Sequence, residues 1–142
     1  MPMKVVPEFV DVIVSRVAHL FFLNAWHITV RSEDDPPRPS GHEDCDGLTA
    51  MNTDYFEARM YFDSGLEPTA EGFEVVIHEV LHLVFAPMRD AVHHIASFIT
   101  LEEDRERLVA QYERVEEQLV TILARGLVQN VDIAAWLKDD TA

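Results

Sequence analysis

Five consecutive residues, His78-Glu79-Val80-Leu81-His82, have the types and the spacing of a helical zinc site. Residues four apart lie on the same face of a helix, so His78 and His82 would direct two imidazoles towards one point. Neutral imidazole is a ligand that suits zinc. Glu79 follows one step round the helix, where its carboxylate can reach a water on the metal and act as a general base. The pattern therefore predicts a catalytic zinc centre.

A five-residue pattern also arises by chance, and its simplest interpretation is two helix histidines beside a solvated glutamate. The surrounding segment, 72–85, is apolar on nearly all sides, which is typical of a buried helix. Buried imidazoles and carboxylates need partners, and a metal ion with a bound water would supply them. The apolar context therefore favours the metal site.

A catalytic zinc ion takes three protein ligands and keeps one position open. In one class of zinc site, a glycine follows the second histidine by three residues and a third histidine ligand follows it by six. That class is excluded here, because Phe85 and Met88 occupy those two positions. His93 and His94 follow soon after. Adjacent histidines on a helix point about 100° apart, so at most one of them could be a ligand. We expect both to be surface groups or supporting groups near the site.

A carboxylate from a later helix is the alternative third ligand. The long periodic segment 101–129 offers Glu113, Glu116 and Glu117. At about 100° per residue, Glu116 falls inside the wider apolar arc of this helix, which is an awkward place for a solvated acid. Helical geometry therefore favours Glu116, and a solvated face is the expected environment of Glu113.

The motif, a preceding strand rich in Tyr and Phe, and the segment 116–127 together resemble a small gluzincin-type zincin. The nearest kind is the minimal metallopeptidase of phages and mobile elements that is related to the ImmA/IrrE domain. In that domain the ligand opens a Glu-x-x-Ala-x-x-Phe-Ala-x-x-Leu pattern. The resemblance covers residues 26–128 and has two conservative departures, Val for Ala and Leu for Phe. The matching residues are Glu117, Val120, Leu123, Ala124 and Leu127.

The resemblance implies a zinc metallopeptidase of the His2Glu type. Zinc (Zn2+) would be held by His78, His82 and Glu117, and Glu79 would be the general base. The resemblance thus favours Glu117 over Glu116, and we follow it, because a helix packed between two elements can be buried on more than one side.

The resemblance also implies where a substrate would bind. In zincins an extended peptide pairs with the edge of a strand that precedes the motif helix, which here is the strand 56–62. Tyr55 or Tyr61 would then be a candidate donor to the developing oxyanion, and the sequence does not choose between them.

The periodicity of the chain predicts the elements that would position these groups. Apolar residues recur at helical spacing in four segments: 8–24, 70–85 with Thr69 as N-cap, 101–129 and 131–137. Three segments read as strands: 26–31, 48–52 and 56–62. Residues 88–100 form a short helix or turn. We expect a minimal zincin-like α+β domain, whose small, mostly antiparallel sheet packs on the N-terminal helix, the motif helix and a long C-terminal helix.

Two further details of this fold are predicted. The long helix should bury an apolar stripe, composed of Leu108, Tyr112, Val115, Leu119, Ile122 and Gly126. The acidic, proline-rich segment 32–47 should be a mobile loop that covers the cleft, and residues 138–142 should be a frayed tail. Within the loop, His42, Asp44, Cys45 and Asp46 are candidate ligands for a second metal, although their spacing matches no known metal-ligand pattern.

Length and composition limit the classes of function that are possible. The 142 residues predict one domain, 1–142. The net charge of −15 disfavours nucleic-acid binding, which needs a basic surface. The single cysteine, Cys45, allows no internal disulfide, and no segment resembles a signal peptide or a membrane span. We therefore expect a cytoplasmic protein that does not associate with membranes.

Three functions are compatible with the sequence. The first is a zinc metallopeptidase that acts on a peptide or protein, for example a single regulatory protein. The second is a non-catalytic, zinc-stabilised acidic domain that binds a protein as an adaptor or inhibitor. The third is a helical interaction module without metal. The sequence predicts neither the substrate nor the oligomeric state.

Overall fold

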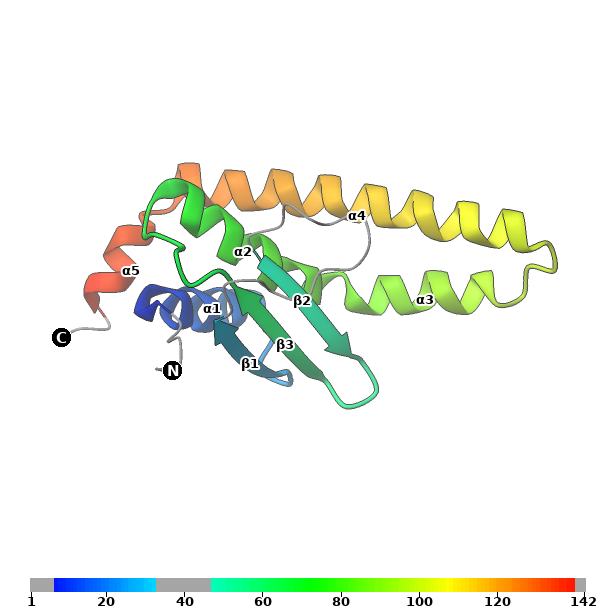
Figure 1. Cartoon of the computed structure of the whole chain (residues 1–142), viewed down its shortest axis with the longest axis horizontal. Helices are drawn as coiled ribbons and strands as arrows, with labels where there is room; N and C mark the ends of the chain where they lie inside the picture. Colours follow the sequence, from blue (N-terminus) through cyan, green and yellow to red (C-terminus); the bar gives the residue numbers. More distant parts are fainter. Residues whose placement is uncertain (1–6, 33–46, 140–142) are drawn as a thin grey trace.

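The computed structural model of the chain describes residues 7–32 and 47–139 and places five helices and three strands in them (Figure 1). The arrangement confirms the predicted α+β class. Most of the predicted loop 32–47, including its candidate ligands, and the last residues of the predicted tail 138–142 lie outside the described residues. The elements are α1 (Glu8–Leu20), β1 (His27–Ser32), β2 (Gly47–Asn52), β3 (Glu57–Phe62), α2 (Ala70–Val84), α3 (Ala86–Ala96), α4 (Glu102–Asn130) and α5 (Ile133–Asp139).

The three strands form one mixed sheet in the order β1-β3-β2. β1 runs parallel to β3, and β2 runs antiparallel to it. The prediction of a mostly antiparallel sheet is therefore only half correct. The strand predicted to be the substrate edge is the centre of the sheet, because β1 and β2 use both of its sides. Side chains on one face of β3 are buried, as the alternation predicts: Ala58, Met60 and Phe62.

The motif helix, α2, is the element on which the others pack. It contacts α1, α3, α4 and β2. Its start is defined by Thr69, whose hydroxyl accepts a hydrogen bond from the Gly72 N–H at 3.2 Å, as an N-cap does. The helix ends at Val84, and Pro87 lies in the first turn of α3. The sequence predicted both ends of this helix.

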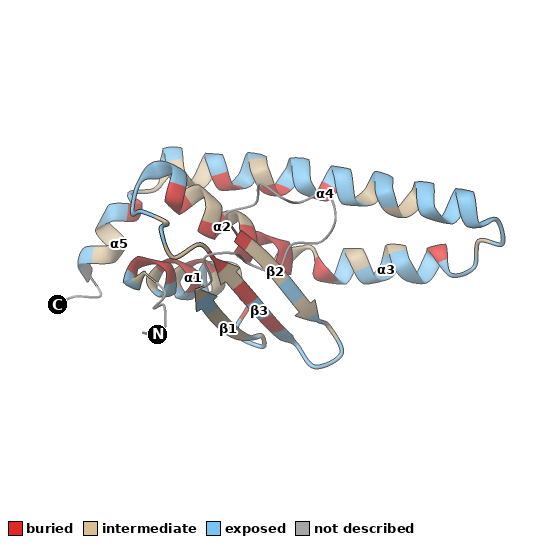
Figure 2. Ribbon diagram, in the orientation of Figure 1, coloured by how far each residue is buried: buried red, intermediate tan, exposed pale blue. Residues whose placement is uncertain are grey.

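Helices α3 and α4 extend beyond the sheet as a two-helix arm (Figure 1). α4 runs antiparallel to α2 and α3, and most of the arm is exposed (Figure 2). No described helix is long and apolar enough to cross a membrane.

The prediction of which residues of α4 form its buried stripe is wrong. Val115, Leu119 and Ile122 are exposed. The buried line faces α2 instead and consists of Glu116, Val120 and Ala124. Polar groups on the neighbouring helices stabilise the buried carboxylate of Glu116. A prediction from apolar periodicity alone cannot detect such a buried acid.

Substitutions at two glycines should change the stability of the fold in opposite directions. A Cβ at Gly72 would lie 1.9 Å from the backbone oxygen of Glu67, whereas a Cβ at Gly126 would have no atom within 4 Å. We expect Gly72→Ala to lower the free energy of unfolding by about 3 kcal/mol. Gly126→Ala should raise it by about 0.5–1 kcal/mol, because alanine loses less backbone entropy in a helix. Urea unfolding followed by circular dichroism measures both, and a Gly72→Ala variant as stable as wild type would contradict the packing of the 63–69 segment on α2.

Candidate metal centre

The two motif histidines converge on one carboxylate. Their ring centroids lie 5.0 Å apart on successive turns of α2. The Nε2 atom of His78 is 3.2 Å from Glu117 Oε2, and the Nε2 atom of His82 is 3.0 Å from Glu117 Oε1. Glu117 therefore faces both imidazoles from α4, the position at which a third ligand is needed.

The site is open on the side of Glu117. The side chain of Glu117 is 50% exposed and that of His78 is 23% exposed, whereas that of His82 is 9% exposed. Hydrogen bonds from the two imidazoles hold the pKa of Glu117 well below its usual range, so the carboxylate is ionised. The Glu117 carboxylate is therefore the most solvent-accessible of these three side chains.

Glu79 lies close to both motif histidines. One ligand atom from each of His78, Glu79 and His82 can be chosen so that all three lie within 4.8 Å of one another. A single water can bridge such a distance, which suits a general base. The Glu79 side chain is buried, and the Thr49 hydroxyl donates to its Oε2 atom at 2.6 Å.

Glu116 contacts the opposite side of His82. The Nδ1 atom of His82 donates to Glu116 Oε2 at 2.8 Å. Tyr112 donates to Glu116 Oε1 at 2.8 Å, and Arg89 pairs with the same carboxylate. Glu116 is completely buried, and burial alone would raise its pKa, but these three hydrogen bonds lower the pKa to about 2. Glu116 is thus an ionised carboxylate at the junction of three helices.

His82 is held between two carboxylates. Burial alone would lower its pKa, but the hydrogen bonds to Glu116 and Glu117 raise the pKa to about 9. The Nδ1–H group is directed at Glu116, so Nε2 is the nitrogen that remains for a metal. A cation at Nε2 would replace the proton there.

These residues fit a zinc ion. Two imidazole Nε2 atoms and one carboxylate form the His2Glu donor set of catalytic zinc sites. A ligating histidine almost always donates its other ring N–H to a carboxylate or carbonyl, and His82 does so to Glu116. The donor types and the orientation of His82 therefore agree with the metal that the motif predicts.

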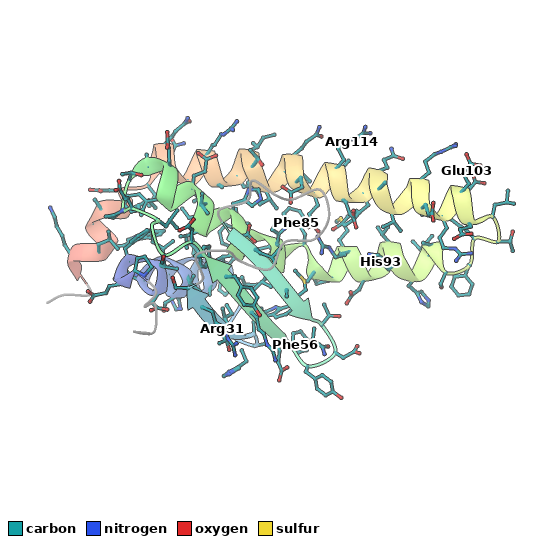
Figure 3. All side chains as sticks on the ribbon, viewed as in Figure 1. Arg31, Phe56, Phe85, His93, Glu103 and Arg114 are labelled. Carbon is teal, nitrogen blue, oxygen red and sulfur yellow. The ribbon has the colours of Figure 1, made fainter. Side chains whose placement is uncertain are left out.

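Several other sequence candidates lie away from this point. Glu113 is exposed on α4, and His93 and His94 are exposed on the arm, as expected (Figure 3). Tyr55 is 73% exposed in the turn between β2 and β3. Tyr61 alternates with the buried residues of β3 and so lies on the face turned away from α2. These positions do not support a role for either tyrosine as a donor at the site.

Sequence reasoning missed three supporting residues, Thr49, Arg89 and Tyr112. Tyr112 precedes Glu116 by four residues on α4, so it lies on the same face. Its hydroxyl also approaches the backbone oxygen of Phe85 at the end of α2. That spacing was a usable signal for Tyr112. Nothing local marks Thr49 or Arg89, because their partners lie 30 and 27 residues away.

Comparison with protein-family models, curated proteins and solved structures finds no match for this chain. The resemblance to a gluzincin therefore depends on the two sequence motifs alone. The positions of the site residues are what supports a function.

The buried carboxylate provides a test of this arrangement. We expect Glu116→Ala to lower the free energy of unfolding by about 3 kcal/mol, because it leaves Arg89 and His82 without their charge partner. Glu113→Ala removes an exposed acid from the same helix and should change that free energy by less than about 0.5 kcal/mol. Urea unfolding of both variants without added metal measures the difference. Equal stabilities would show that the Glu116 cluster does not hold the helices together.

Proposed function

We propose that the protein is a zinc-dependent peptidase of the His2Glu type. The observation that carries the proposal is the convergence of four groups from two helices. Glu117 contacts the Nε2 atoms of both His78 and His82, and one carboxylate oxygen of Glu79 lies within 4.8 Å of a ring nitrogen of each histidine. The half-exposed Glu117 supports access for a substrate.

The residues take separate roles in this proposal. His78, His82 and Glu117 would hold the zinc ion, and Glu116 would orient His82 through Nδ1. Bound zinc would supply a Lewis acid that polarises a peptide carbonyl and lowers the pKa of a water.

Glu79 would move the proton. Its carboxylate takes a proton from the water whose oxygen adds to the carbonyl carbon. The bond between that carbon and the amide nitrogen then breaks, and Glu79 passes the proton to the leaving nitrogen. The carboxylate is regenerated, so the sum of the steps is the addition of one water across the peptide bond.

The strand that would receive an extended peptide is β2. β3 is excluded because both of its edges are paired. The outer edge of β2 pairs with no strand in residues 7–32 and 47–139, and β2 packs against α2. A peptide that pairs there would bind by main-chain hydrogen bonds, and its side chains would add specificity.

A second function, a zinc-stabilised domain that binds a protein, has one observation in its favour. The end of α3 and the turn that follows it expose large apolar side chains: Ile95 (57%), Phe98 (74%) and Leu101 (65%). Clusters of exposed apolar side chains mark interaction sites. Such a domain would keep its function without a general base, which separates it from a peptidase.

Purified protein should therefore contain zinc and cleave an unstructured protein. We expect Glu79→Gln to keep the zinc and to lose cleavage by at least about 100-fold, because general acid–base catalysis contributes about that much. Zinc content by atomic emission and the rate of cleavage measure the two properties. Cleavage by Glu79→Gln at the wild-type rate would refute the proposed mechanism, and protein without zinc would refute the metal site.

The third ligand can be tested on binding alone. Loss of a group that only orients a ligand costs about 10- to 100-fold in metal affinity. We expect Glu117→Ala to lose more than this and Glu116→Gln to lose an amount in this range. Glu113→Ala, one turn away on the exposed face, should bind zinc as wild type does. Competition with a chromogenic chelator measures all four affinities, and a Glu117→Ala variant with wild-type affinity would remove Glu117 from the ligand set.

A further inference from the structure

The strand β2 contacts the proposed base, Glu79, through Thr49. The Thr49 hydroxyl lies 2.6 Å from Glu79 Oε2 and 3.2 Å from the backbone oxygen of the same residue. Thr49 pairs with Met60 and Gly47 pairs with Phe62, both of them buried residues of β3. Cross-strand partners share a face of a sheet. Thr49 and Gly47 are therefore on the face of β2 that packs on α2.

The two contacts of the Thr49 hydroxyl are not equivalent. A hydroxyl has one proton to donate. The contact with Oε2 has the short length of a hydrogen bond to an ionised carboxylate, and the contact with the backbone oxygen is much longer. The proton is therefore directed at Oε2. Within the described residues Glu79 accepts no second side-chain hydrogen bond, so Oε1 is the oxygen left to accept a proton from water.

Gly47 lets the strand approach this closely. A Cβ at this position would lie 3.1 Å from Glu79 Cγ and 3.2 Å from two ring carbons of Phe62. Both distances are shorter than ordinary contacts between carbon atoms. Any larger residue would displace the Glu79 side chain or move β2 away from α2.

We propose that Thr49 is a positioning residue for Glu79 and that Gly47 makes room for this contact. The hydrogen bond at Oε2 holds the carboxylate in one rotamer, in which Oε1 is the oxygen that takes the proton. This inference deepens the proposed function and rests on it. Because β2 is also the proposed substrate strand, one element then positions both the substrate and the base.

Thr49→Val tests the proposal, because valine has nearly the shape of threonine and cannot donate. We expect kcat to fall about 10- to 100-fold, the cost of a misplaced catalytic group. KM and zinc content should stay within about twofold of wild type. Thr49→Ser restores the hydroxyl and should recover most of kcat. A loss of kcat in Thr49→Val that Thr49→Ser does not share would show that the hydroxyl positions Glu79, and would exclude a general effect on the fold.

Thr29→Val is the matched control. Thr29 lies on β1 opposite Arg59, on the other face of the same sheet, so the same chemical change there should leave kcat unchanged. Gly47→Ala is a second variant, which should lower kcat with zinc retained. If Thr49→Val does not fold, Gly47→Ala decides, and a Gly47→Ala variant with the kcat of wild type would overturn the proposal.

A structural measurement keeps this inference distinct from the proposed function. In a high-resolution crystal structure of Thr49→Val, the Glu79 carboxylate should leave its wild-type rotamer or occupy more than one. A carboxylate that keeps its single wild-type rotamer overturns the role of Thr49, whether or not the protein is active. Wild-type protein that cleaves nothing, but shows the rotamer change in the variant, overturns the peptidase and keeps the role of Thr49 in positioning Glu79.

Discussion

A carboxylate that no solvent reaches joins three helices. Glu116 is fully buried, and its carboxylate accepts hydrogen bonds from His82 of α2, Arg89 of α3 and Tyr112 of its own helix, α4. Burying an ionised carboxylate is very costly unless charged or donating groups satisfy it. These three groups can meet the carboxylate only when α4 lies beside the end of α2 and the start of α3 at one height. The cluster therefore constrains the register and the rotation of α4, together with the buried Val120 and Ala124.

The candidate metal site follows from that constraint. Glu117 is the next residue of α4, about 100° further round the helix. With Glu116 directed at the Nδ1 atom of His82, this rotation directs Glu117 at the Nε2 atoms of both motif histidines. Adjacent acids thus differ in environment, one dry and one half-exposed. This difference explains why the two sequence arguments favoured different residues. Helical geometry identified Glu116, which is buried, and the family resemblance identified Glu117, which faces both motif histidines.

The motif helix receives its other partner from the sheet. β2 brings the Thr49 hydroxyl to Glu79. Neither the place of β2 at the edge of the sheet nor its contact with α2 was visible in the order of the strands along the chain. The expected substrate strand was wrong because β3 lies between β1 and β2, so both of its edges are paired. Tyr61 lies away from α2 for a different reason, which is that it alternates with the buried residues of β3.

Local patterns in the sequence were sufficient for the elements and for half of the site. The α+β class, the two ends of α2, the N-cap at Thr69 and the shared face of His78 and His82 all depend on residues a few positions apart, whose geometry the helix itself imposes. The tertiary structure alone decided which acid faces which nitrogen and which strand supports Glu79. Those contacts join residues 34 and 30 positions apart. Their geometry depends on strand order and helix rotation, which follow from the packing of the whole domain and are not encoded in the period of any one segment.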